Sequence, residues 1–205
     1  NYILIGSIPY MSNLNKNITE FALYLVQGYV SEGDVVEDAT CGNGYDTLQL
    51  AQLSPAKLYA FDIQQVAVVA TRKRLREAGF AEKLENGAIE VICDSHEHLT
   101  DHVKTFIQAA VFNLGYLPGA DKGCTTSASS TMRAVRSCLS RLEPDGLVCI
   151  TMYSGHPAGR QEKEHLLAFA ENLDKRQWHC AYINLINQPA APPEILLITR
   201  KKRPE

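Results

Sequence analysis

The alternation of short apolar runs with longer helical patterns is the feature that most constrains the fold of this chain. Strands separated by helices are typical of a parallel sheet whose crossover helices cover both faces. The predicted strands span 35–39, 58–62, 89–92, 109–114, 146–153, 178–186 and 194–200. The predicted helices span 15–29, 44–53, 64–78, 127–142 and 159–173, with a short helical stretch that reaches Ile107. Gly79 marks a helix end, and residues 144–146 form a turn signal. We therefore predict an α/β fold built on seven strands.

The last two predicted strands differ from the others because only a Pro-rich loop joins them. Such a short connection favours an antiparallel pair at one edge of the sheet. The 205 residues contain no internal repeat or low-complexity tract. We expect one domain over 1–205, opened by the helix at about 15–29.

Composition excludes several classes of protein. The net charge is −3, from 20 Lys and Arg against 23 Asp and Glu, so a nucleic-acid partner would need a local basic patch. The sequence contains no signal-peptide pattern and no apolar stretch of about 18 residues, so we expect no membrane association. The six scattered cysteines form no C-x-x-C pair, which favours reduced thiols and a cytoplasmic protein.

The densest chemical signal follows the first predicted strand. An apolar run leads to Asp38, and Gly42 and Gly44 follow it directly before a predicted helix. Glycines let the backbone approach a ligand, and a helix N-terminus offers free N–H groups. Thr47 stands where a dinucleotide-binding fingerprint has its third glycine, which disfavours an NAD-type oxidoreductase.

Three further polar sites end the next predicted strands. Asp62 follows the second strand, where it could accept the hydroxyls of a ribose or cap the following helix. Asp94 and Ser95 follow the third strand, where an adenine edge could bind. Asn113 ends the fourth strand and begins a Gly- and Pro-bearing loop. Ligands of open α/β sheets bind at these carboxyl ends, so the pattern predicts a nucleoside site.

These segments resemble class I S-adenosylmethionine-dependent methyltransferases, which have a Rossmann-like fold. The resemblance is closest to a small bacterial group described as rRNA methylases, and it spans nearly the whole chain. Its motifs are D-A-T-x-G-N-G-x-D-T at 38–47, F-D-I-Q at 61–64, D-x-H-E at 94–97, F-N-L-G-Y-L-P at 112–118, D-K at 121–122 and G-H-x-x-G-x-x-E at 155–162. The resemblance implies a seven-stranded, mostly parallel sheet with an antiparallel last strand.

The resemblance also implies S-adenosylmethionine as cofactor and S-adenosylhomocysteine as product. For some members it implies methylation of tRNA at the wobble position, on the amine of 5-aminomethyl-2-thiouridine. The anticodon region of tRNA is then the expected partner, with no role for DNA, and a homodimer would widen the RNA-binding surface. The expected cofactor contacts are Asp38, Thr40, Cys41, Gly42, Asn43, Gly44, Asp46, Thr47, Asp62, Ile63, Gln64, Asp94, Ser95, His96 and Asn113.

Methyl transfer to an amine needs a positioned nitrogen lone pair. The side-chain oxygen of Asn113 and the carbonyl of Leu114 are candidates to accept the hydrogens of the amine. The segment that carries them resembles the N-P-P-Y loop of amino-methyltransferases, although here it reads N-L-G-Y. Tyr116 could stack on the target base or pack on its own scaffold. The candidates for substrate contact are Tyr116, Leu117, Pro118, Lys122, Tyr153, His156 and Arg160.

Some interpretations remain open at this stage. His156 could accept a proton from the substrate, contact a phosphate or cap the next helix. His96, His98 and His102 have a spacing that suits a metal, but the cofactor already supplies the electrophile, so we expect no metal site. The basic residues 200–203 could hold RNA or form a solvated terminus. A small-molecule methyltransferase, an rRNA methyltransferase and an inactive binding module are the alternatives to a tRNA enzyme.

Overall fold

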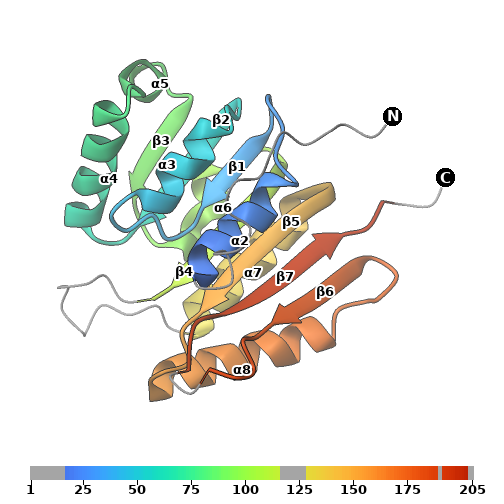
Figure 1. Cartoon of the computed structure of the whole chain (residues 1–205). Coiled ribbons are helices and arrows are strands. Elements are labelled where there is room, and N and C mark those ends of the chain that lie inside the picture. The colour runs from blue at the N-terminus through green and yellow to red at the C-terminus, as the bar shows by residue number, and fades with distance from the viewer. Residues whose placement is uncertain (1–16, 116–127, 189–190, 203–205) are drawn as a thin grey trace, which may run out of the picture.

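The computed structural model describes residues 17–115, 128–188 and 191–202, and within them seven strands form one sheet (Figure 1). The strand order is β3-β2-β1-β4-β5-β7-β6. The strands are β1 (Val35–Asp38), β2 (Lys57–Asp62), β3 (Ile89–Cys93), β4 (Ile107–Leu114), β5 (Leu142–Met152), β6 (Trp178–Ile183) and β7 (Glu194–Arg200).

The pairing confirms the predicted sheet. Strands β1 to β5 pair in parallel, whereas β7 pairs antiparallel with both β5 and β6. The last strand is therefore the antiparallel one, and the β6–β7 pair lies at one edge, with β6 outermost. Because the first five strands share one direction, their carboxyl ends meet at the same edge of the sheet.

Helices cover both faces of the sheet, as predicted. On one face α2, α3 and α4 bury Leu23, Leu50 and Val68 against the strands. On the other face α6, α7 and α8 bury Leu99, Val135 and Leu166. The helices are α2 (Ile18–Gln27), α3 (Tyr45–Gln52), α4 (Gln65–Glu77), α5 (Ala81–Glu85), the 3-10 helix η1 (His96–His98), α6 (Leu99–His102), α7 (Ala128–Arg141) and α8 (Pro157–Glu171). In the described parts of the chain, none of the helices is both long and apolar enough to cross a membrane.

Three local predictions need correction. The short helix α5 was not predicted, because none of its five residues is buried and it therefore has no apolar periodicity. Strand β4 already begins at Ile107, where we expected a helical stretch to end. Strand β5 begins at Leu142, before the expected turn at 144–146. Those turn residues lie in an irregularity between two register pairs, Ile107 with Leu142 and Ala109 with Leu147, where Asp145 takes φ 63°.

Glu37 is an unusual residue for the centre of a buried strand. Its side chain is fully buried, Oε1 has no hydrogen-bond partner among the described residues, and Oε2 accepts from Cys138 Sγ at 3.7 Å. Burial raises the pKa of this carboxyl to about 8. The group is therefore mostly protonated at neutral pH, since the apolar surroundings disfavour the charged form.

This burial predicts a pH-dependent stability. An unfolded Glu ionises above about 4.5, whereas the folded one stays neutral up to about 8, so stability declines across that interval as pH rises. Glu37→Gln should reduce this slope by up to about 1.4 kcal/mol per pH unit. Urea unfolding between these pH values measures it. Some slope should remain because Asp38 also has a raised pKa; an unchanged slope in the variant contradicts the assignment.

Candidate active site

The loop between β1 and α3 is the centre of the candidate site, at the carboxyl edge of the sheet. Gly42 and Gly44 adopt φ of 50° and 77°, in the left-handed region that favours glycine. Thr71 Oγ1 and Arg74 Nε, both from α4, donate to the carbonyls of Gly42 and Asn43 at 2.9 and 2.7 Å. Nothing in the spacing of the sequence identifies these two α4 residues as supports of the loop.

Asp38 ties the loop to the helix that follows it. Its Oδ2 accepts from Thr47 Oγ1 at 2.6 Å and its Oδ1 accepts from Thr40 N at 3.2 Å. Asp38 and Thr47 are both fully buried, and burial raises the pKa of Asp38 to about 7. Helix α3 begins after Gly44 with no side-chain cap, so backbone N–H groups of its first turn remain available for an anion.

Asp62 lies at the end of β2 and also holds the glycine loop. Its Oδ2 accepts from Gly42 N at 3.0 Å, and its Oδ1 accepts from Gln64 N at 2.8 Å. The second contact is a local turn and not the helix cap considered from sequence, because α4 begins at Gln65 with Gln64 at the N-cap position and no side-chain cap. Each carboxylate oxygen keeps capacity for another donor, so ribose binding stays compatible with this geometry. Ile63, the next residue, exposes half of its surface.

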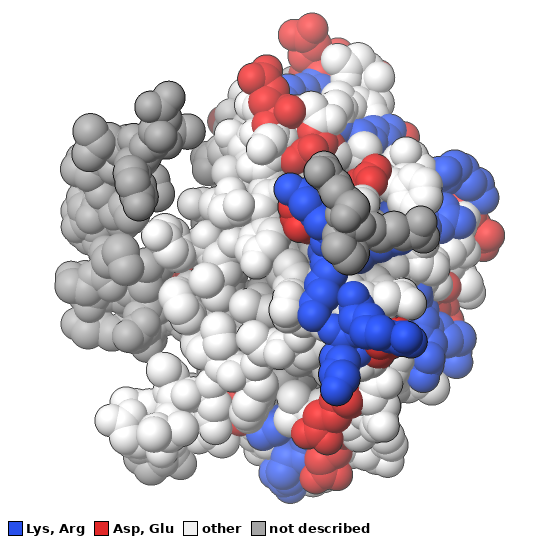
Figure 2. Space-filling view, turned by 90° about the vertical axis from the view of Figure 1, so that its right-hand side faces the viewer, with Lys and Arg blue, Asp and Glu red and all other residues white. Residues whose placement is uncertain are grey.

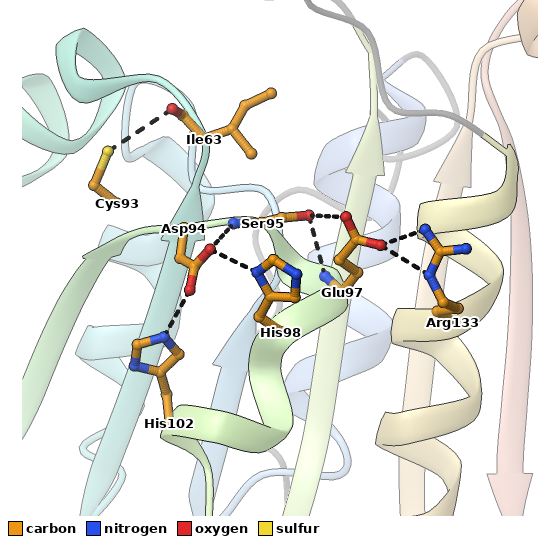
Figure 3. A network of polar contacts seen from close by, with 8 residues as sticks. All are labelled: Ile63, Cys93, Asp94, Ser95, Glu97, His98, His102 and Arg133. Atoms are coloured by element: carbon orange, nitrogen blue, oxygen red, sulfur yellow. Dashed lines mark hydrogen bonds and ion pairs between the residues drawn. The ribbon is translucent and has the colours of Figure 1, made fainter.

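Asp94 anchors a polar network at the end of β3 (Figure 3). Its carboxylate accepts from Ser95 N at 2.7 Å and contacts His98 Nδ1 and His102 Nε2, each at 2.9 Å. These contacts, with His102 the largest contributor, lower the pKa of Asp94 to about 2. The site predicted to meet an adenine edge is thus a carboxylate already oriented by two histidines.

The remaining histidine of this segment is buried under the loop. His96 Nδ1 lies 3.2 Å from the carbonyl of Ala39, while Nε2 has no partner among the described residues. Because a carbonyl only accepts, Nδ1 carries the proton, and burial lowers the pKa of the ring. His96 is therefore a buried contact that supports the loop between β1 and α3. Across the described residues, no group of three or more His, Cys, Asp or Glu side chains is arranged to hold a metal ion.

Asn113 lies at the end of β4 in a network the sequence does not reveal. Its backbone N–H donates to Thr40 Oγ1 at 2.7 Å, and its Nδ2 donates to Asp46 Oδ2 at 3.1 Å. Tyr153, which follows β5, is hydrogen-bonded to the same amide. Burial raises the pKa of both Asp46 and Tyr153. The ends of β4, β5 and α3 thus converge on one side-chain amide.

His156 has the helix-capping role considered from sequence. Its Nδ1 accepts from Gly159 N at 3.0 Å at the start of α8. The neutral ring must then carry its proton on Nε2, so accepting a further proton would break the cap. This geometry argues against His156 as the proton acceptor. Arg160 donates to the carbonyl of Ser154, and Leu114 is buried; Tyr116, Leu117, Pro118 and Lys122 lie outside the described residues.

The donor set fits S-adenosylmethionine, which carries a sulfonium, an ammonium and a carboxylate. Three carboxylates with raised pKa values, Asp38, Asp46 and Asp62, surround the glycine loop and favour a cationic ligand. The uncapped N-terminus of α3 suits the carboxylate of the cofactor. The two cationic groups and the carboxylate of the ligand thus find complementary groups at one edge of the sheet.

The sheet order and this loop define a class I S-adenosylmethionine-dependent methyltransferase. The chain belongs to the family described as putative rRNA methylase, whose model matches residues 58–199. It is 33% identical over 193 residues to a chloroplastic tRNA (mnm5s2U34)-methyltransferase of Arabidopsis thaliana, covering 91% of this chain and 70% of that one.

Solved structures agree with this classification. A putative rRNA methylase from Clostridium thermocellum superposes with a TM-score of 0.84 at 31% identity, covering 90% of this chain and 97% of that one. A putative methyltransferase from Streptococcus mutans, solved in complex with S-adenosylhomocysteine, has a TM-score of 0.78 at 32% identity, covering 89% and 97%. The protein is therefore a methyltransferase that uses S-adenosylmethionine.

Gly44 needs a corrected interpretation. The sequence pattern explains this glycine by close approach of the backbone to a ligand. In the structure, a Cβ on Gly44 would lie 2.8 Å from Thr71 Cα and 2.9 Å from Thr71 Oγ1. The glycine is therefore required by the close packing of the loop against α4.

We expect Gly44→Ala to lower the melting temperature, with a loss of about 2–4 kcal/mol from overpacking and left-handed strain. Gly87→Ala is the matched control, because Gly87 has φ 79° and a Cβ added there would meet nothing within 4 Å. The control should lose only the strain, about 1–2 kcal/mol. Calorimetric melting compares the two variants. Equal losses of stability would mean that Thr71 can move aside without an energetic penalty.

Asp62→Ala should weaken binding of S-adenosylhomocysteine by about 1.5–3 kcal/mol, because it removes an acceptor for the ligand and the hydrogen bond that holds Gly42 N. Titration calorimetry measures this. Asp34→Ala is the control, because Asp34 also accepts from a backbone N–H, that of Ser31 at 2.7 Å, but before β1. Asp34→Ala should bind normally; unchanged affinity in Asp62→Ala would remove Asp62 from the cofactor site.

Proposed function

We propose that this methyltransferase modifies the anticodon region of tRNA and methylates the amine of 5-aminomethyl-2-thiouridine at the wobble position. The observation that carries the reaction type is the side-chain amide of Asn113, fixed by Asp46 at the carboxyl edge of the sheet. The substrate rests on the match to a tRNA (mnm5s2U34)-methyltransferase over 91% of this chain.

Asn113 orients the acceptor amine. Because Nδ2 donates to Asp46, the rotamer of the amide is set and Oδ1 is the group left to accept hydrogens from the amine. The carbonyl of Leu114 is the second acceptor in this proposal. Two acceptors on the hydrogens direct the nitrogen lone pair, which is the main requirement for in-line transfer. When bound, S-adenosylmethionine supplies the electrophilic methyl group.

The substrate amine must lose its ammonium proton before it attacks. Because Nδ1 of His156 is engaged in the helix cap, the proton leaves to solvent or to Asp46, whose carboxylate lies beside Asn113. Burial raises the pKa of Asp46, which makes it a better base than an exposed aspartate. If solvent is the acceptor, the rate should rise with pH toward the pKa of the amine, and Asp46→Asn should keep that profile.

An rRNA substrate is the second candidate, favoured by the description of the family. Purified protein and S-adenosylmethionine are incubated separately with tRNA carrying 5-aminomethyl-2-thiouridine and with ribosomal RNA. Mass spectrometry of the digested nucleosides then locates the added methyl group. Methylated wobble nucleoside supports the proposal; methylation confined to rRNA, or no methylation of the tRNA, overturns it.

We expect Asn113→Ala to lower kcat by about 10²-fold or more, because the lost hydrogen bonds act mainly in the transition state. Affinity for S-adenosylhomocysteine should change far less. Single-turnover methylation of tRNA, together with calorimetry, separates these two effects.

Asn172→Ala is the matched control, since the Nδ2 of Asn172 donates to the carbonyl of Ala168 on an exposed helix end. This variant should turn over like the wild type. Wild-type turnover by Asn113→Ala would exclude the end of β4 as the catalytic centre.

A further inference from the structure

A basic surface lies at the amino end of the sheet, away from the glycine loop. We define the amino-end basic face by six residues: Arg141, Lys175, Arg176, Arg200, Lys201 and Lys202. Figure 2 shows Lys and Arg side chains gathered in a band on this side of the molecule. The residues come together because Trp178 of β6 pairs with Arg200 of β7, and Lys201 N donates to the carbonyl of Gln177 at 2.8 Å.

Half of these cations are held by backbone carbonyls. Arg141 donates to the carbonyl of Val103, Arg200 to that of Leu142, and Lys201 Nζ to that of Lys175. A carbonyl orients a cation without cancelling its full charge. Two others pair with carboxylates, Lys202 with Asp145 at 2.6 Å and Arg176 with Asp174 at 3.0 Å. The face thus keeps a positive charge on a chain whose net charge is −3.

The distance between this face and the candidate active site limits which ligands can contact both. Strand β5 begins at Leu142, whose carbonyl binds Arg200, and ends at Met152, directly before Tyr153. Ile107 and Leu114 of β4 pair with those two residues, so at about 3.3 Å per residue of β4 the two ends of β5 are about 23 Å apart. A mononucleotide is too short to reach both. A folded RNA can place one part in the site and a distant phosphate run on this face.

We infer that the amino-end basic face binds the phosphate backbone of the tRNA body, outside the anticodon arm that carries the reacting base. This inference rests on the proposed function. Phosphate contacts supply RNA affinity by releasing counterions, so they are sequence-independent and weaken as salt increases. The face would therefore make intact tRNA a better substrate than an isolated anticodon stem-loop.

The test compares two RNAs, an intact tRNA and its isolated anticodon stem-loop, both bearing 5-aminomethyl-2-thiouridine. The variant is K201E/K202E, in two partly solvated residues that follow β7. We expect its affinity for intact tRNA to fall about tenfold or more, and the plot of log affinity against log salt to become shallower by about 2. Affinity for the stem-loop and for S-adenosylhomocysteine should be unchanged.

The control is K73E/R76E, two exposed cations of α4, which packs at the opposite edge of the sheet beside β3. It makes the same change in charge and should leave tRNA affinity close to that of the wild type. Equal losses in the two double variants would show only a general effect of charge. Equal losses on intact tRNA and stem-loop would place the contact in the anticodon arm. Either result overturns the inference.

Two further readouts keep this inference separate from the proposed function. Failure of the wild type to methylate the wobble base of intact tRNA counts against the function, whatever K201E/K202E does to binding. Unchanged tRNA affinity in K201E/K202E, with normal methylation, counts against the face alone. A last measurement uses vesicles containing phosphatidylserine. If K201E/K202E abolishes binding to these vesicles and leaves tRNA affinity unchanged, the face binds anionic lipid and the inference is overturned.

Discussion

The buried carboxylate of Asp38 is the contact on which the candidate site depends. It holds Thr47 in α3 and the backbone of Thr40 in the loop, so strand, loop and helix are fixed by one side chain. Thr40 in turn accepts the backbone N–H of Asn113, which joins the end of β4 to the same unit. A buried carboxylate is costly unless its oxygens are satisfied, and here the cost is offset by hydrogen bonds that also set the geometry of the site.

The fold was predictable because its signals are local and periodic. Apolar runs at strand spacing indicated seven strands and their parallel arrangement, and the short Pro-rich connection before β7 identified the antiparallel edge. The positions of Asp38, Asp62, Asp94 and Asn113 at successive strand ends followed from the same pattern. The pattern does not show which side chains the fold brings together, because hydrogen bonds between residues far apart in the sequence produce no recognisable spacing. Asp46 with Asn113 is one such pair.

The roles that the sequence alone leaves undecided have the same origin. Gly44 was interpreted through a ligand, whereas its nearest neighbour is Thr71, on another helix. The role of His156 depended on which ring nitrogen is engaged, and only the contact with Gly159 N decides that. The electrostatics of the site also emerge only in three dimensions. Clustered carboxylates favour a charged sulfonium over the neutral thioether of the product, so the same groups that bind the methyl donor would assist release of S-adenosylhomocysteine.

The position of β7 has a consequence for the order in which the chain can fold during synthesis. Of the seven described strands, β7 is synthesised last, yet it lies between β5 and β6. Until it emerges, β6 has no neighbour in the sheet, and one side of β5 remains an open edge exposed to other chains. The first five strands, which carry the loop and Asn113, can assemble earlier. Completion of the sheet therefore waits for its last strand. A nascent chain stalled shortly before β7 would display the unpaired β6 and the open edge of β5 to chaperones and proteases.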